Sequence, residues 1–201
     1  MNQPYVLVLY YSRSGGTQNL ALHIARGVDK IDGIDARIRA VPPVSTVIER
    51  TASAVPDSGA VFCSKEDLRG CSGLALGSAT RFGNMAAPMK YFIDTTSDLW
   101  AENALVGKPA SVFTSSASIH GGQESTLLTM MVPLLHQGML IQGLPYSLPA
   151  LHQTRSGGTP YGVTHLQGSD DPAVLSEDEA ALAIAAGMQL AQTALRLAPA
   201  T

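Results

Sequence analysis

Hydrophobic and polar positions form blocks along the chain, and the blocks predict strands that alternate with helices. Short, continuous apolar runs are typical of strands that are buried on both faces of a parallel sheet. Such runs occupy residues 5–11, 71–77 and 109–115, and another begins at 140–144. Residues 34–41 instead alternate apolar with polar side chains, which predicts a half-buried strand near a sheet edge.

Apolar residues recur at helical spacing between these runs. Leu20, Ile24 and Val28 share one face of a first predicted helix. The same spacing predicts helices over 85–99 and over 124–137, and the second of these ends just before a glycine. The chain therefore alternates strand with helix over most of its length.

This alternation predicts an α/β fold with helices on both faces of a parallel sheet. Five strands fit the flavodoxin-like order 2-1-3-4-5, in which ligands bind outside the carboxyl ends of the strands. Ser176 and Glu179 have the spacing of a capping box, so a last helix is expected to begin there. We expect a single domain over 1–201, with loop insertions around 42–70 and 146–172.

Composition narrows the classes of function. The chain has 201 residues, of which 14% are charged, and its net charge is −3. A basic face for nucleic acid is therefore not expected, and no apolar run reaches the roughly 18 residues of a membrane span. The first residues lack the pattern of a signal peptide. Two cysteines cannot build a disulfide framework, so a cytoplasmic location is expected.

The segment after the first predicted strand has the chemistry of a phosphate site. It places two glycines and three hydroxyl side chains at the start of a helix, where unpaired N–H groups favour an anion. No Lys-Ser/Thr pair follows the glycines, so the segment is not a Walker A loop, and it lacks the G-x-G-x-x-G pattern of dinucleotide sites. A mononucleotide phosphate is therefore favoured at Ser12, Arg13, Ser14, Gly15, Gly16 and Thr17.

Eight short blocks stand in order along the chain. They are VLYYS at 8–12, TRFGNM at 80–85, LW at 99–100, GK at 107–108, SVF at 111–113, GGQE at 121–124, HQGM at 136–139 and GGTPYG at 157–162. With these blocks the sequence resembles the WrbA family of flavodoxin-like, FMN-dependent NAD(P)H:quinone oxidoreductases. The resemblance runs from about Tyr5 to the C-terminal helix.

The resemblance implies that FMN is the cofactor, with its phosphate on the segment 12–17. It implies that the flavin ring lies against two more loops, formed by Thr80, Arg81, Phe82, Gly83 and Asn84, and by Ser115, Ser116, Ala117, Ser118, Ile119, His120 and Gly121. His136 matches a position close to the flavin of a neighbouring subunit and is expected to contact the flavin or donate a proton. Trp100 matches a position at the substrate pocket. Family members assemble as tetramers, so a homotetramer is expected.

The function implied by the resemblance is hydride transfer from NAD(P)H to FMN and then two-electron reduction of a quinone, in a ping-pong cycle. Two alternatives stay open: an electron-carrier flavodoxin, and a regulatory or binding flavoprotein without catalysis. Ser14 departs from the family pattern, because a tyrosine tied to the nicotinamide site often stands there. Neither H-E-x-x-H nor C-x-x-C spacing occurs, so no metal site is expected.

Overall fold

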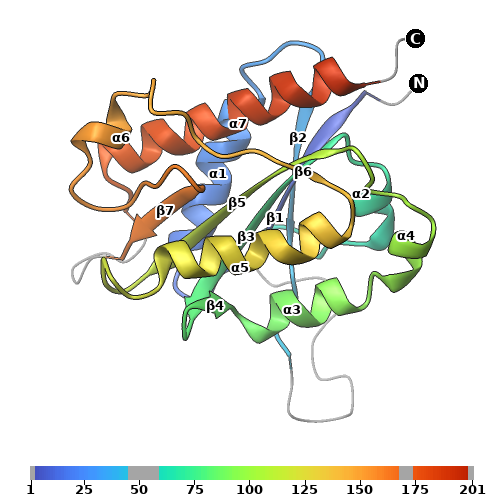
Figure 1. Ribbon diagram of the computed structural model, residues 1–201, viewed down its shortest axis with the longest axis horizontal. Helices are drawn as coiled ribbons and strands as arrows, with labels where there is room; N and C mark the ends of the chain where they lie inside the picture. The colour runs from blue at the N-terminus through green and yellow to red at the C-terminus, as the bar shows by residue number, and fades with distance from the viewer. Residues whose placement is uncertain (1–2, 45–58, 168–173, 199–201) are drawn as a thin grey trace.

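Parallel strands form the centre of the molecule, and helices cover both faces of the sheet (Figure 1). The computed structural model describes residues 3–44, 59–167 and 174–198. On one face of the sheet lie α1 (Gly16–Val28) and α7 (Glu177–Leu197). This arrangement confirms the predicted α/β class.

Four long strands give the sheet its order. β1 (Tyr5–Tyr11) lies between β2 (Asp35–Ala40) and β3 (Gly73–Arg81), and β5 (Pro109–Ser116) lies on the far side of β3. All of these neighbours run parallel. β1 and β5 are buried along almost their whole length because helices cover both of their faces, whereas β2 is half-buried at the edge.

The predicted number of five strands is wrong, although the predicted order holds for the segments that were expected. Within the described residues the sheet has seven strands, along the path β2-β1-β3-β5-β6. β6 (Leu140–Ile141) pairs only with the start of β5, and β7 (Val163–Leu166) pairs with the end of β5. The fifth position is thus shared by two short strands, because the chain leaves the sheet after β6 and returns at β7. β4 (Asn84–Met85) pairs antiparallel with the end of β3.

The second predicted insertion, 146–172, is therefore not a simple loop. It contains α6 (Ala150–Gln153) and β7. β7 has only four residues, and a run this short gives no hydrophobic pattern that distinguishes a strand from the turns around it. Residues 168–172 of this insertion lie outside the described residues.

The second face of the sheet carries α3 (Ala87–Asp94), α4 (Ser97–Ala101) and α5 (Gln123–His136). The helix expected over 85–99 is two helices instead. Thr95 and Thr96 interrupt it, since each side-chain hydroxyl donates to the carbonyl three residues earlier and competes with the helical pattern. α5 ends close to where the sequence predicted.

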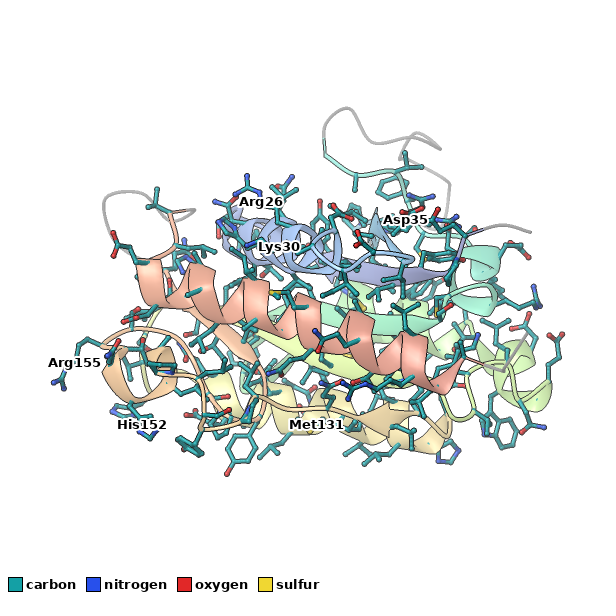
Figure 2. The ribbon with its side chains drawn as sticks, turned by 90° about the horizontal axis from the view of Figure 1, so that it is seen from above. Arg26, Lys30, Asp35, Met131, His152 and Arg155 are labelled. Carbon is teal, nitrogen blue, oxygen red and sulfur yellow. The ribbon has the colours of Figure 1, made fainter. Side chains whose placement is uncertain are left out.

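α7 crosses α1 at very short range. A Cβ atom added to Gly187 would lie 2.0 Å from the Ile24 carbonyl oxygen, and one added to Gly27 would lie 2.0 Å from the Ile184 carbonyl oxygen. Figure 2 looks onto α7, with α1 beside it. Among the described helices α7 has the length and apolar composition of a possible membrane span, but its apolar face packs against α1 and the sheet, as in the core helix of a globular domain.

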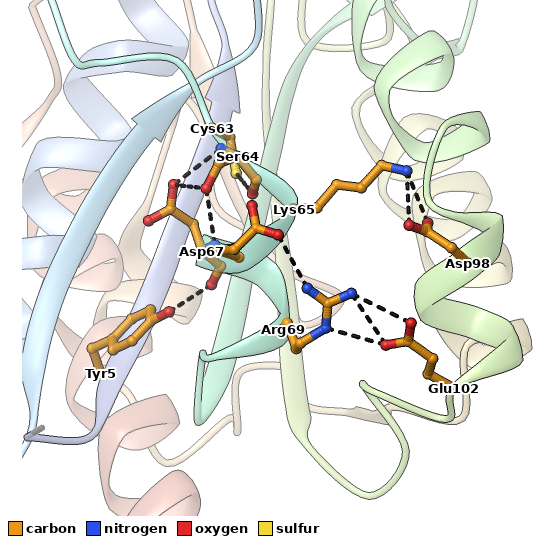
Figure 3. A network of polar contacts seen from close by, with 9 residues as sticks. Tyr5, Cys63, Ser64, Lys65, Asp67, Arg69, Asp98 and Glu102 are labelled. Carbon is orange, nitrogen blue, oxygen red and sulfur yellow. Dashed lines mark hydrogen bonds and ion pairs between the residues drawn. The ribbon is translucent and has the colours of Figure 1, made fainter. Parts of the chain in front are cut away.

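Charged side chains connect α2 (Lys65–Arg69) both to α4 and to the edge strand β2. Figure 3 shows the ion pairs on the α4 side, between Lys65 and Asp98 and between Arg69 and Glu102. Asp67 forms a capping box with Ser64 and ion pairs with Arg37 at 3.2 Å and Arg39 at 3.0 Å. Burial alone would raise the pKa of Asp67, but the hydrogen bonds from Ser64 and Arg39 hold it below its usual value. This helix belongs to the first predicted insertion, 42–70, of which residues 45–58 lie outside the described residues.

Candidate functional site

The carboxyl ends of β1, β3, β5 and β7 meet at one edge of the sheet, and the segments that follow them surround a cavity of about 400 Å³. Most of its lining comes from the three segments that the sequence singled out, although these lie far apart in the chain. The lining residues are Arg13, Ser14, Ala79, Thr80, Arg81, Ser115, Ser116, Ala117, Ser118, Gly121 and Gln167. This volume is in the range of small-molecule sites.

The first segment, residues 12–17, turns sharply into α1. Gly15 has φ 93°, a conformation that glycine adopts without strain, and it stands immediately before the helix. The Gly15 N–H donates to Ser12 Oγ over 3.2 Å. No acidic residue occupies the first turn of α1, so its N–H groups and helix dipole favour an anion at this end.

Thr17 and Ser12 belong to the predicted phosphate segment but do not line the 400 Å³ cavity. Thr17 is buried, and its hydroxyl lies 2.7 Å from Ser115 Oγ, so it ties the start of α1 to the end of β5. Ser12 lines a neighbouring hollow beside β2 and not the 400 Å³ cavity. Of the predicted phosphate segment, Arg13 and Ser14 are the side chains that line this cavity.

The second segment is a tight hairpin and not an open loop. Thr80 and Arg81 still belong to β3, and Phe82 and Gly83 form the turn into β4. Both turn residues have positive φ, 51° and 74°, as two-residue hairpin turns require. The backbone of Phe82 is in a conformation that is unfavourable for a residue with a bulky side chain. Its ring is fully exposed at the tip of the hairpin, so packing does not offset this cost. Such uncompensated strain is typical of functional sites.

The third segment begins inside β5, which includes Ser115 and Ser116, and continues to the start of α5. Ser116 Oγ donates to the Ser118 carbonyl oxygen over 2.8 Å and accepts from Gln123 Nε2 over 2.8 Å. Gln123 is buried and thereby fixes the shape of the turn. Gly122 has φ 95° and precedes α5.

The second and third segments touch each other. Thr80 Oγ1 donates to the Gly122 carbonyl oxygen over 3.3 Å and also forms a hydrogen bond with Thr126 Oγ1. A Cβ atom added to Gly122 would lie 2.8 Å from Gly83 Cα, so only glycine allows the two backbones to approach this closely. The hairpin is therefore held against the start of α5 as one wall of the site.

A second, larger cavity of about 770 Å³ lies on the other side of the hairpin and shares Arg81 with the first. Its walls are mainly apolar and come from β4, α3 and α5. They include Phe82, Met85, Ala86, Ala87, Pro88, Val132 and Pro133. A polar cavity next to an apolar one suits a charged ligand with a second, apolar and planar ligand bound beside it.

The electrostatics of the 400 Å³ cavity favour an anion. Arg13 and Arg81 line it, and none of the described residues in its lining carries a carboxylate. The chain as a whole has a charge of −3, so this preference is local to the cavity.

A buried carboxylate joins the β7 side of the site to α7. Glu179 Oε1 accepts hydrogen bonds from Gly157 N at 2.8 Å and Leu166 N at 2.9 Å. Glu179 Oε2 accepts from Ser176 N and pairs with His165 Nδ1, both at 2.9 Å. Burial alone would raise the pKa of Glu179, but these hydrogen bonds lower it to about 2. The sequence predicted the capping box of Ser176 and Glu179, which the structure confirms, but not this wider role.

His136 and Trp100 lie together beside the 770 Å³ cavity but line neither of the two cavities. His136 is the last residue of α5, and its ring stacks on Trp100 with 5.8 Å between centroids. Both line a hollow of about 280 Å³, which shares Lys90 and Pro133 with the 770 Å³ cavity. Ile119 and His120 are exposed residues of the third segment and do not line the 400 Å³ cavity. The roles of these four residues toward a ligand remain predictions.

Sequence reasoning missed three contributors to the site: Ala79, Gln123 and Gln167. Gln123 stood inside the GGQE block and could have been found there. Gln167 lay in a stretch interpreted as a loop, and only the pairing of β7 with β5 brings it to the cavity. Within the described part of the chain, no three His, Cys, Asp or Glu side chains form a group that could hold a metal ion.

Comparison with known proteins adds to this geometry. Residues 4–150 match the family model described as NADPH-dependent FMN reductase. A protein of Geobacter sulfurreducens named NAD(P)H dehydrogenase (quinone) is 40% identical over 201 residues, which cover 96% of this chain and 98% of the relative. A protein of Chromohalobacter salexigens with the same name is 41% identical over 203 residues, with the same coverage.

Solved structures show the same fold. A flavodoxin, WrbA-like protein from Agrobacterium tumefaciens superposes with a TM-score of 0.67 at 19% identity, covering 96% of this chain and 98% of that one. A flavodoxin from the domain Archaea gives a TM-score of 0.62 at 18% identity, with coverage of 95% and 99%. These likenesses confirm the flavodoxin-like fold. The chain belongs to the NADPH-dependent FMN reductase family, together with its full-length relatives named NAD(P)H dehydrogenase (quinone).

Proposed function

We propose that this protein is an FMN-dependent oxidoreductase that takes a hydride from NAD(P)H and delivers two electrons to a quinone in a ping-pong cycle. The observation that carries the proposal is the paired arrangement of cavities. A polar, arginine-lined cavity at the carboxyl edge of the sheet adjoins a larger apolar cavity. The names of the relatives supply the substrate classes, NAD(P)H and a quinone.

The residues present fit FMN. Its phosphate dianion needs donors and positive charge, which the N–H groups at the start of α1 and the cation of Arg13 provide. The planar ring needs a wall of fixed shape, and the close contact between Gly83 and Gly122 holds the hairpin against the start of α5 to form one. We propose that Thr80, Arg81 and the turn 115–121 bound the ring.

The 770 Å³ cavity is the proposed place for the substrates. Its apolar walls exclude water beside the ring, and Phe82 at the hairpin tip offers an aromatic face against which a nicotinamide or a quinone can stack. When bound, FMN supplies the chemistry: it accepts a hydride and passes two electrons on. The chain's own part is to hold the phosphate, orient the ring and keep one ring face open for each substrate in turn.

Anaerobic stopped-flow mixing tests the cycle. NADH or NADPH mixed with the FMN-loaded protein is expected to bleach the flavin absorbance without any quinone present, because the first half-reaction of a ping-pong cycle is complete in itself. Benzoquinone added afterwards should restore the absorbance. An electron-carrier flavodoxin would stay oxidised until a separate reductase was added, and that result would contradict the proposed function.

We also propose that the protein is a cytoplasmic homo-oligomer. By analogy with the family that the sequence resembles, the oligomer is a tetramer. Leu128, Val132 and Leu135 form an exposed apolar stripe on α5, and Tyr91 and Trp100 are exposed on the neighbouring α3 and α4. Exposed apolar patches of this kind are typical of interaction surfaces. Such contacts would also place His136, at the end of α5, close to a neighbouring subunit.

Light scattering after size exclusion tests this assembly. The unchanged protein is expected to have the mass of an oligomer. Val132→Glu buries a charge in the proposed contact and is expected to yield monomers, whereas Val174→Glu, an equally exposed valine before α7, should leave the mass unchanged. A monomeric mass for the unchanged protein would contradict the proposed assembly.

A further inference from the structure

Gln167 lies directly after β7 and lines the 400 Å³ cavity, and hydrogen bonds hold the backbone at Gln167 and at the residue before it. Its N–H donates to the Ser116 carbonyl oxygen over 2.8 Å, which continues the pairing of β7 with β5. The preceding N–H, of Leu166, donates to the buried carboxylate of Glu179 over 2.9 Å. The side chain of Gln167 therefore starts from a fixed point at the cavity wall.

The side chain reaches the phosphate segment from the opposite side of the cavity. Ser14 Oγ donates to Gln167 Oε1 over 3.1 Å, across 153 positions of sequence. Both residues line the same cavity. This bond orients the carboxamide: its oxygen, Oε1, is held by Ser14, and its nitrogen, Nε2, carries two N–H donors.

Most other hydroxyls in the cavity lining are already engaged within the protein. Ser115 is bonded to Thr17, Ser116 to Ser118 and Gln123, and Thr80 to Gly122 and Thr126. Gln167 Nε2, by contrast, makes no hydrogen bond to any residue in the described part of the chain. The cavity thus contains an oriented neutral donor that no group in the described part of the protein accepts from.

We propose that Gln167 is a phosphate-binding residue, whose carboxamide Nε2 donates to the terminal phosphate of the bound mononucleotide while Oε1 keeps its bond to Ser14. This inference rests on the proposed binding of FMN. The three predicted segments form three walls of the cavity, and Gln167, at the end of β7, forms a fourth. Ser14 acts here as a positioning residue, because its hydroxyl holds the carboxamide in place.

Equilibrium titration of apoprotein, followed by flavin fluorescence, tests this role with FMN and with riboflavin, which lacks the phosphate. Gln167→Ala is expected to raise the Kd for FMN roughly tenfold, because a hydrogen bond to a charged group is lost. The Kd for riboflavin should stay within about twofold of wild type. Gln167→Glu, which has nearly the same shape but places a negative charge beside the phosphate, should weaken FMN binding further than alanine does.

Gln153→Ala is the matched control, since Gln153 is an exposed glutamine at the end of α6 and lines neither cavity. Unfolding midpoints of the apoproteins, expected to lie close to wild type, show that each variant folds. The inference is overturned if FMN binds both Gln167 variants as tightly as wild type, or if FMN and riboflavin lose affinity equally. Failure of wild type itself to bind FMN would instead overturn the proposed function, and this inference with it.

Discussion

Gly15→Asp is expected to raise the Kd for FMN at least about a hundredfold. The substitution places a carboxylate immediately before α1, where the structure has N–H groups, the helix dipole and no acidic side chain. Two like charges would then compete for one site, and their repulsion is strong because the helix end is partly shielded from water. Titration of the apoprotein with FMN measures the change.

Gly33→Asp is the control for the backbone effect of this substitution. Gly33 also has a positive φ, 88°, and nothing lies within 4 Å of the position that its Cβ would take. It follows α1 and lines neither cavity. Both variants therefore carry similar strain, but only Gly15→Asp should lose FMN affinity. Equal FMN affinity for the two would show that the phosphate does not bind at the start of α1.

Glu179→Gln is expected to lower the free energy of unfolding by about 3 kcal/mol at pH 7. The carboxylate accepts hydrogen bonds from three backbone N–H groups and pairs with His165, and both side chains are about 1% exposed. An amide has one acceptor fewer and turns its own N–H groups toward a donor. Urea unfolding measures the difference. Glu177→Gln, on the exposed side of the same first turn, should change it by less than about 0.5 kcal/mol.

The effect of Glu179 is expected to depend on pH in one direction. Its pKa in the folded protein, about 2, lies below the ordinary value of 4.5. The unfolded chain therefore takes up the proton first as the pH falls, and the stabilisation by Glu179 is complete above about pH 5 and is lost between pH 4.5 and 2. The difference in stability between wild type and Glu179→Gln should shrink over that window. A difference that stays constant from pH 7 to pH 3 would contradict the lowered pKa.

Much of the fold could be predicted from the sequence because its strongest elements are also its most buried. The run YVLVLYY became β1, and the spacing of Leu20, Ile24 and Val28 became the inner face of α1. The missed elements are those that local pattern does not determine. β7 has four residues and is stabilised as a strand by its pairing with the end of β5. The break between α3 and α4 depends on two threonine hydroxyls.

The candidate site could be predicted in part for a similar reason. Glycines and hydroxyls after buried strands indicate ligand loops, so the three segments were found, and the structure brings them to one cavity. The pattern could not show that Thr80 and Ser116 still lie within strands, or that Thr17 and Ser115 bond to each other. Gln167 and the wider role of Glu179 depend on contacts between segments distant in sequence, which no local spacing records.

Equilibrium titration of the folded apoprotein with FMN tests the central claim most directly. The claim predicts saturable uptake of one FMN per chain, with tighter binding of FMN than of riboflavin because residues 12–17 hold the phosphate. A well-folded apoprotein that takes up no FMN, or that binds riboflavin as tightly as FMN, would contradict it.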